Sequence, residues 1–171
     1  MSLIDILNAR EERWIRKCAL SKEEKRCVVS LTLRMPSELR LSEAAEKALT
    51  QGRKEVFTLL ERVSPALSFK GQFVSADGPY ALFTVAGNGC EIKKLLMRFE
   101  EESRFGDLID ADVMSADCEE ISRLTVGGKV RKCLVCGKDD ARLCAKNAVH
   151  TRKETIEAIE RILKKRLEKG E

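Results

Sequence analysis

Apolar residues in the first third of the chain recur at spacings that predict a helix, a strand and a second helix. Residues 3–18 carry apolar side chains near one helical face. Residues 27–35 are rich in β-branched side chains and are followed by a proline, which is typical of a strand. Ser42 is a suitable helix N-cap, because Glu43 and Glu46 follow it and an apolar face continues to Val63.

The apolar pattern in the middle of the chain predicts a hairpin, a helix and a strand. Residues 66–76 and 80–86 are short apolar runs joined by Asp77-Gly78-Pro79, three residues that favour a turn. Residues 91–102 place apolar side chains at helical spacing. Residues 108–114 alternate between apolar and polar positions, as a short strand does.

The order of these elements predicts an α+β fold. Residues 121–125 are a candidate for one more strand, and residues 153–169 predict a charged final helix. Strand, helix, strand, strand, helix, strand over residues 27–114 indicates an antiparallel sheet in a split β-α-β, or ferredoxin-like, arrangement with helices on one face and added terminal helices. We treat residues 1–171 as a single domain, in which residues 129–171 hold a Cys/His segment and the last helix.

Composition and charge narrow the class of protein. Hydrophobic residues make up 43% and charged residues 35%, which excludes a disordered or fibrous chain. A net charge of +4 suits a polyphosphate ligand or an acidic protein partner. No apolar run approaches the ~20 residues of a membrane-spanning helix, and the N-terminus lacks the apolar core of a signal peptide. We therefore expect a cytoplasmic protein whose seven cysteines are reduced thiols.

Two carboxylates in the strand predicted over residues 108–114 are the sharpest chemical feature. Asp110 and Asp112 would point to the same face of the strand, about 7 Å apart, while the apolar residues between and beside them face the opposite layer. Two such carboxylates repel each other unless a cation lies between them, and Mg²⁺ prefers carboxylates together with substrate phosphates. Gly106 would let the backbone approach a phosphate. An exposed acidic edge is the alternative interpretation.

Four potential metal ligands follow in the C-terminal segment. Cys133 and Cys136 form a C-x-x-C pair, and Cys144 and His150 come after it. Three thiolates and one imidazole suit tetrahedral Zn²⁺, although the spacing differs from common zinc-finger patterns. A redox pair, simple packing of buried thiols, and a direct catalytic role are alternatives that the spacing leaves open.

Motifs spread over most of the chain together match a known family. They are Arg10-Glu11-Glu12-Arg13, Ser75-Ala76-Asp77-Gly78-Pro79, Lys93 or Lys94, Glu100 or Glu101, Gly106 to Val113, Ile121-Ser122-Arg123, Arg131-x-Cys133-Leu134-x-Cys136, Ala141, Cys144-Ala145 and His150. This combination resembles the citrate lyase holo-acyl carrier protein synthases, also called apo-citrate lyase phosphoribosyl-dephospho-CoA transferases. The family's usual His-Pro-Leu-Gly-Arg reads Ser103-Arg104-Phe105-Gly106-Asp107 here, so a histidine and an arginine are replaced.

The resemblance implies a nucleotidyltransferase reaction. The 2'-(5''-phosphoribosyl)-3'-dephospho-CoA prosthetic group would pass from its triphosphate precursor, triphosphoribosyl-dephospho-CoA, to a serine of the apo acyl carrier (gamma) subunit of citrate lyase, releasing diphosphate. Mg²⁺ on Asp110 and Asp112 would orient the triphosphate. The residues expected to hold substrate are Arg10, Arg13, Gly106, Arg123 and Arg131.

Three alternatives remain at this point. The first is the equivalent transferase for a malonate decarboxylase carrier subunit. The second is a non-enzymatic, zinc-stabilised basic module that binds RNA. Only 5% of the residues are aromatic, so the chain offers few side chains for stacking on bases, and we expect no nucleic-acid partner. The third is an inactive relative, since a histidine and an arginine of the family pattern are replaced.

Overall fold

The computed structural model describes residues 2–138 and 140–168. Within these residues, helices α1 to α6 and strands β1 to β5 occur together with one 3-10 turn, η1. In chain order they are α1 Leu3–Glu24, β1 Cys27–Leu33, α2 Ser37–Arg40, α3 Glu43–Glu61, β2 Ser68–Ser75, β3 Gly78–Val85, α4 Gly89–Glu102, η1 Gly106–Leu108, β4 Ile109–Met114, β5 Glu120–Ile121, α5 Ala141–Lys146 and α6 Arg152–Glu168.

The strands form one antiparallel sheet in the order β2-β3-β1-β4-β5. The first four strands have the order expected of a ferredoxin-like arrangement, and the short β5 is added at the edge. The α+β prediction is therefore confirmed. The register pairs Thr32 with Asp110 and Ser30 with Asp112, so both aspartates lie beside the central strand.

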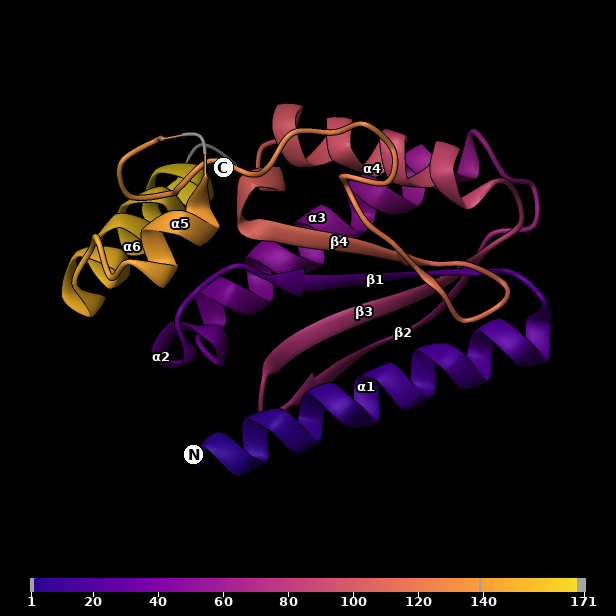
Figure 1. Ribbon diagram of the computed structural model, residues 1–171, viewed down its shortest axis with the longest axis horizontal. Helices are drawn as coiled ribbons and strands as arrows, with labels where there is room; N and C mark the ends of the chain where they lie inside the picture. The colour runs from indigo at the N-terminus through magenta and orange to yellow at the C-terminus, as the bar shows by residue number, and fades with distance from the viewer. Residues whose placement is uncertain (1, 139, 169–171) are drawn as a thin grey trace.

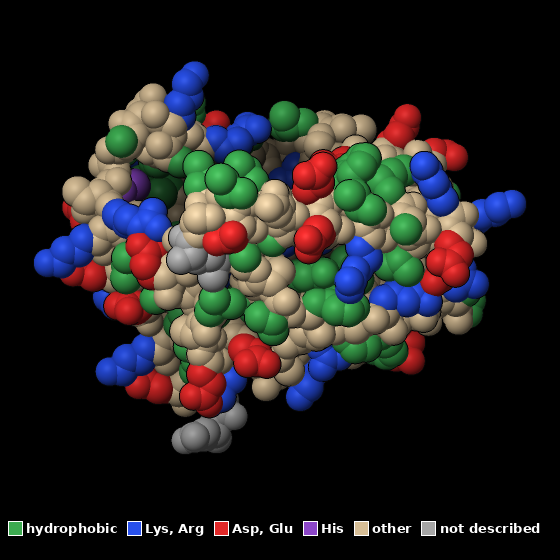
Figure 2. Space-filling model, turned by 90° about the horizontal axis from the view of Figure 1, so that it is seen from below, with side chains coloured by type: hydrophobic (Ala, Val, Ile, Leu, Met, Phe, Trp, Pro, Cys, Tyr) green, Lys and Arg blue, Asp and Glu red, His purple; other side chains and the backbone are tan. Residues whose placement is uncertain are grey.

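Helices cover both faces of the sheet (Figure 1). α3 and α4 pack on one face, where most of the buried apolar side chains gather. The added N-terminal helix α1 lies across the other face, over a smaller apolar cluster that includes Cys18, Tyr80 and Met114. α5 and α6 sit together at one end of the sheet. Seen from the α1 side, hydrophobic side chains lie among acidic and basic ones (Figure 2), and Leu3 and Trp14 of α1 are exposed.

Local signals explain where several elements begin. The Ser42 hydroxyl accepts a hydrogen bond from the backbone of Ala45 and so caps α3, as predicted. The Asn88 side chain caps α4 in the same way. Gly52, in the middle of α3, leaves room for β4, because a Cβ there would lie 1.9 Å from Cδ1 of Ile109. The glycine thus weakens α3 locally but allows α3 and β4 to pack closely.

Several boundaries differ from the prediction. α1 runs on to Glu24, because a long helix is needed to cross the sheet. β4 begins at Ile109, and Leu108 belongs to η1 and is buried in the core. Residues 122–125 are not a strand, since only Glu120–Ile121 pairs with β4. The six-residue α5 was not predicted.

The cysteines also differ from expectation. Cys18 of α1 and Cys118 of the β4–β5 turn form a disulfide, so the prediction that all seven cysteines are reduced thiols is wrong for these two. The physical reason is that α1 crosses the sheet and brings residues 100 positions apart to a Cα–Cα distance of 5.1 Å. The other five cysteines are free. Among the described helices, none is both long and apolar enough to cross a membrane.

Candidate active site and metal-ligand cluster

Asp110 and Asp112 lie where the sequence predicts, on one face of β4. Both are half-buried, whereas Ile109, Ala111 and Val113 are buried in the core beneath α3 and α4. The two carboxylates line a cavity of about 350 Å³. Basic side chains that share this cavity are Arg34, Lys93, Arg123, Arg131 and Arg142. The pair thus opens into a cavity rich in cations, while 45% of the Asp110 side chain stays exposed.

The cavity forms along the part of the outer edge of β4 that β5 does not cover. β5 pairs only with Val113 and Met114, so the outward backbone groups of residues 109–112 need other partners. Charged side chains supply them. Glu100 accepts a hydrogen bond from Ala111 N at 2.7 Å, and Lys93 Nζ donates to Ala111 O at 2.7 Å. The edge of the strand is thus lined by fixed charges.

The sequence leaves open whether Lys93 or Lys94, and whether Glu100 or Glu101, belongs to the site. Lys93 and Glu100 are the buried residues of these two pairs. Glu100 is 3% exposed and Lys93 is 4% exposed, whereas Glu101 and Lys94 are exposed. Both belong to α4, which places them against β4 from its core side. The structure therefore selects Lys93 and Glu100 as the residues of the site, a choice that helical spacing alone cannot make.

Arg131 joins three parts of the site. Its Nη1 donates to Asp110 Oδ1 at 3.1 Å, to Ile109 O at 2.7 Å and to Glu100 Oε1 at 3.3 Å. Its Nη2 donates to Gly106 O at 2.8 Å. A guanidinium with this many acceptors has one fixed orientation. One edge of the group is therefore held beside Asp110.

Arg123 is held by the same buried carboxylate. Its Nε and Nη2 donate to Glu100 Oε2 at 3.1 and 2.5 Å, and its Nη1 donates to Lys129 O at 3.0 Å. Glu100 thus links Arg123 and Arg131 to each other and to β4. Figure 1 shows that the segment carrying both arginines runs beside β4 between β5 and α5.

Arg34 is a residue of the site that sequence analysis missed. It follows β1, and the register that pairs Leu33 with Ile109 brings it beside the start of β4. Its Nη1 donates to Asp107 O at 3.0 Å. Burial, together with the nearby charge of Arg131, lowers the pKa of Arg34 to about 10. A basic residue directly after a buried strand was the signal that could have identified it.

Asp112 is electrostatically unfavourable in its ionised form. Burial raises its pKa from 3.8 to about 6, and the charge of Asp110 adds to the effect, while Lys93 and Lys17 oppose it. Within the described part of the chain, no side chain donates a hydrogen bond to its carboxylate. A divalent cation between Asp110 and Asp112 would relieve this repulsion, and two carboxylates with open space for phosphates suit Mg²⁺.

Gly106 is required by packing. It is buried, and a Cβ there would lie 2.1 Å from Phe99 O, at the end of α4. The close approach is therefore between two segments of this chain, and contact with a phosphate stays a prediction. The next residue, Asp107, bonds to Arg166 of α6 at 2.5 Å, so an arginine lies near the position where the family pattern has one.

Arg10 and Arg13 lie elsewhere and do not line the cavity of Asp110 and Asp112. Both bond to Asp77 in the β2–β3 turn at 3.0 Å, and Arg40 bonds to the same carboxylate. Burial of Asp77 favours the protonated carboxyl and raises its pKa. Hydrogen bonds from Arg10 and Arg13 outweigh this effect and hold the pKa of Asp77 below its usual value. The arginines are drawn there because a buried carboxylate needs compensation. Their contact with substrate phosphate stays a prediction.

Cys133, Cys136, Cys144 and His150 come together as a cluster of potential metal ligands. One ligand atom from each residue can be chosen so that all four lie within 4.8 Å of one another. The unpredicted α5 makes this possible, because it carries Cys144 back to the C-x-x-C turn. The spacing looked irregular only because the sequence does not show that helix.

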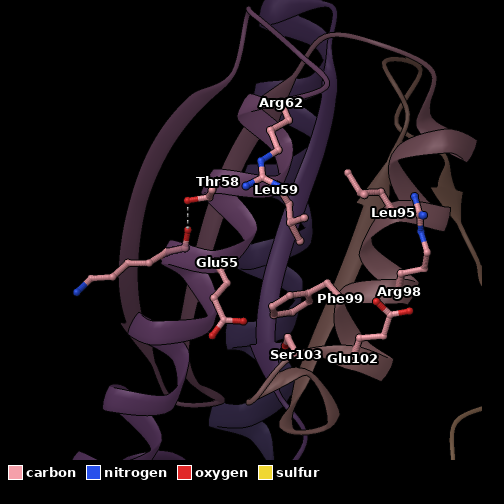
Figure 3. Close-up of a pocket in the computed structure, with 10 residues that line it drawn as sticks. Glu55, Thr58, Leu59, Arg62, Leu95, Arg98, Phe99, Glu102 and Ser103 are labelled. Carbon is pink, nitrogen blue, oxygen red and sulfur yellow. Dashed lines mark hydrogen bonds between the residues drawn. The ribbon is translucent and has the colours of Figure 1, made fainter. Parts of the chain in front are cut away.

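A groove between α3 and α4 is a further depression of the surface (Figure 3). It has a volume of about 580 Å³, and Leu59, Leu95 and Phe99 contribute its apolar lining. Thr58 lies on its α3 side, where its hydroxyl donates to Lys54 O at 3.2 Å. No predicted site residue lines this groove, which belongs to the helices on the other face of the sheet from Asp110.

Comparisons with known proteins agree with the motifs. Residues 1–166 match the family model described as apo-citrate lyase phosphoribosyl-dephospho-CoA transferase. Relatives with that description from Escherichia coli O1:K1 / APEC and from Shigella boydii serotype 18 are each 25% identical to this chain over 163 residues. The alignments cover 95% of this chain and 88% of each relative.

Proposed function

The chain belongs to the apo-citrate lyase phosphoribosyl-dephospho-CoA transferase family, and from this premise we propose that it is a nucleotidyltransferase acting on a carrier protein. The donor is triphosphoribosyl-dephospho-CoA. The acceptor is a serine of the apo acyl carrier subunit of citrate lyase, and the whole chain acts as one transferase domain. The observation that carries the proposal is the cavity in which Asp110 and Asp112 face a set of arginines.

The charges of this cavity suit transfer of a nucleotidyl group. The serine oxygen attacks the phosphorus next to the ribose, a phosphodiester forms, and diphosphate leaves. Such reactions depend on positioning the phosphates and neutralising their charge. Mg²⁺ held by Asp110 and Asp112 would supply part of that neutralisation.

The basic side chains supply the rest. Arg34 and Arg142 line the cavity, and Arg123 and Arg131 are oriented before substrate arrives by their bonds to Glu100. A guanidinium that is already oriented loses little entropy when it binds a phosphate oxygen. We propose that these four arginines hold the triphosphate.

Mass measurement of the carrier tests the proposal. The protein is incubated with apo-carrier, triphosphoribosyl-dephospho-CoA and Mg²⁺, and the carrier should gain the mass of the prosthetic group. Asp110→Asn and Asp112→Asn should each abolish the gain. Asp117→Asn is the matched control, because Asp117 is an exposed residue in the β4–β5 turn. No gain with the unaltered protein refutes the enzyme, and full activity in both site variants refutes the site.

The same assay separates the alternatives. A carrier subunit of malonate decarboxylase in place of the citrate lyase subunit shows which acceptor is used. An RNA-binding module would instead show salt-dependent nucleic-acid affinity and no loss of function in Asp110→Asn. We propose a cytoplasmic location, and we propose Zn²⁺ as the ion of the Cys/His cluster.

A further inference from the structure

We propose that Cys133, Cys136, Cys144 and His150 bind one structural Zn²⁺, and that this ion holds Arg131 in place beside Asp110. The proposal makes the Cys/His segment a support for the candidate active site. It has two parts, the metal site itself and its effect on the neighbouring arginine.

The distance between the sulfur atoms fits a shared tetrahedral ion. With Zn–S bonds of about 2.3 Å, two sulfurs on a tetrahedral ion lie about 3.8 Å apart. The Sγ atoms of Cys136 and Cys144 are 3.8 Å apart. A disulfide between two of the three thiols would leave the third thiol and the imidazole without a partner, whereas one Zn²⁺ uses all four groups.

The state of His150 is an independent observation. Its Nε2 atom is buried and has no hydrogen-bond partner among the described residues. A buried polar nitrogen without a partner is unfavourable, and such groups are rare in native proteins. His150 is also the only histidine of the chain. Coordination of a metal ion would satisfy the imidazole.

Four protein ligands make the site structural. Three thiolates and one imidazole complete the tetrahedral shell of Zn²⁺, so no position remains for water or substrate. Cys133 and Cys144 are buried, which limits access to the ion further. The ion therefore stabilises this part of the chain and takes no direct part in the transfer.

The segment around the cluster has little regular secondary structure of its own to support it. Between β5 and α5, the described residues include neither helix nor strand. α5 has six residues, and a helix that short is not stable by itself. Two backbone bonds, from Gly137 N to Cys133 O and from Cys133 N to Lys138 O, close the C-x-x-C turn at 2.9 Å each.

The same segment carries Arg131. Cys133 is two residues away, and Ala141 N donates to Arg131 O at 2.9 Å. α5 therefore holds the backbone of Arg131 directly, and Cys144 of α5 is a proposed zinc ligand. Arg34 contacts the segment as well, through Nη2 to Lys132 O at 3.2 Å. An ion that ties α5 to the C-x-x-C turn would fix Arg131 at the cavity.

Metal content tests the first part. Protein purified under reducing conditions from zinc-supplemented cells should contain one zinc per chain. Replacing the ion by Co²⁺ should give the absorption bands of tetrahedral cobalt with thiolate ligands. Cys136→Ser should lose most of the metal, and Cys136→His should retain it, because Cys136 is exposed and histidine supplies a nitrogen ligand. Cys90→Ser is the control, since Cys90 is free and lies outside the cluster.

Hydrogen exchange tests the second part. Amides of residues 129–146 should exchange at least tenfold faster in Cys136→Ser than in Cys90→Ser, while amides of β1 to β4 stay protected and show that the fold is intact. Absence of zinc and of the cobalt bands in the unaltered protein overturns the metal site. Unchanged exchange after loss of zinc overturns the positioning role. Neither measurement depends on transfer activity, so failure of the proposed function leaves this inference standing.

Discussion

Replacing Asp112 by asparagine should stabilise the fold and abolish transfer at the same time. Asp112 lies half-buried next to Asp110 and raises the energy of the folded state when it is ionised. Asparagine has nearly the same shape without the charge. The variant therefore removes a repulsion that the protein would retain only for the sake of binding a cation.

The size of the effect follows from the pKa of Asp112. Its value is raised from 3.8 to about 6, which is about two units. At ~1.4 kcal/mol per unit, ionised Asp112 destabilises the folded state by about 3 kcal/mol at pH 8 and by about half of that at pH 5. The pKa of Asp112 is higher in the folded than in the unfolded state. Protonated Asp112 therefore causes no loss of stability below pH 4, and the full loss develops as the pH rises through 6.

Urea unfolding at pH 5 and pH 8, without added divalent cation, measures this difference. The free energy of unfolding of Asp112→Asn should exceed that of the unaltered protein by about 3 kcal/mol at pH 8 and by about half of that at pH 5. Asp117→Asn, at an exposed position, should show no such difference. Carboxylates remote from Asp112 titrate equally in both proteins and cancel.

Two results would refute the reasoning. One is equal stability of Asp112→Asn and the unaltered protein at pH 8. The other is a difference that is larger at pH 5 than at pH 8. Addition of Mg²⁺ gives a second readout, because an ion that binds only the folded state stabilises by about 1.4 kcal/mol at ten times its dissociation constant. The unaltered protein should gain this, and Asp112→Asn should not.

Three further substitutions examine the rest of the site. Glu100→Gln removes the charge that holds Arg123 and Arg131. It should lower the free energy of unfolding by about 3 kcal/mol and the transfer rate more than tenfold. The control Glu101→Gln should change neither quantity by much. Gly106→Ala places a Cβ against a backbone oxygen of α4, so urea unfolding should show a loss of at least about 2 kcal/mol, and an unchanged midpoint would contradict the packing described here. Arg10→Gln should leave the transfer rate within about threefold if Arg10 acts only on Asp77. A larger loss with unchanged stability would instead support contact with substrate.

Local sequence patterns predict the order of the four long strands, of α3 and α4, and the direction of the two aspartates. Alternation along residues 109–113 depends only on neighbours in the chain, since successive side chains of a strand point to opposite faces. The helical faces of α3 and α4 and the turn at residues 77–79 depend on local patterns of the same kind. These are the parts that were predicted correctly, and they include the central pair of the candidate site.

The residues that join this pair follow from contacts between distant parts of the chain. Glu100 and Arg131 bond to the backbone of Ala111 and Ile109 because β5 leaves this part of the outer edge of β4 unpaired. Arg34 enters through the register of β1 with β4, and Arg10 is drawn instead to a buried carboxylate on another turn. These contacts join residues far apart in the chain. Strand order and the compensation of buried charge determine which residues meet, and neither of these two factors leaves a periodic pattern in the sequence.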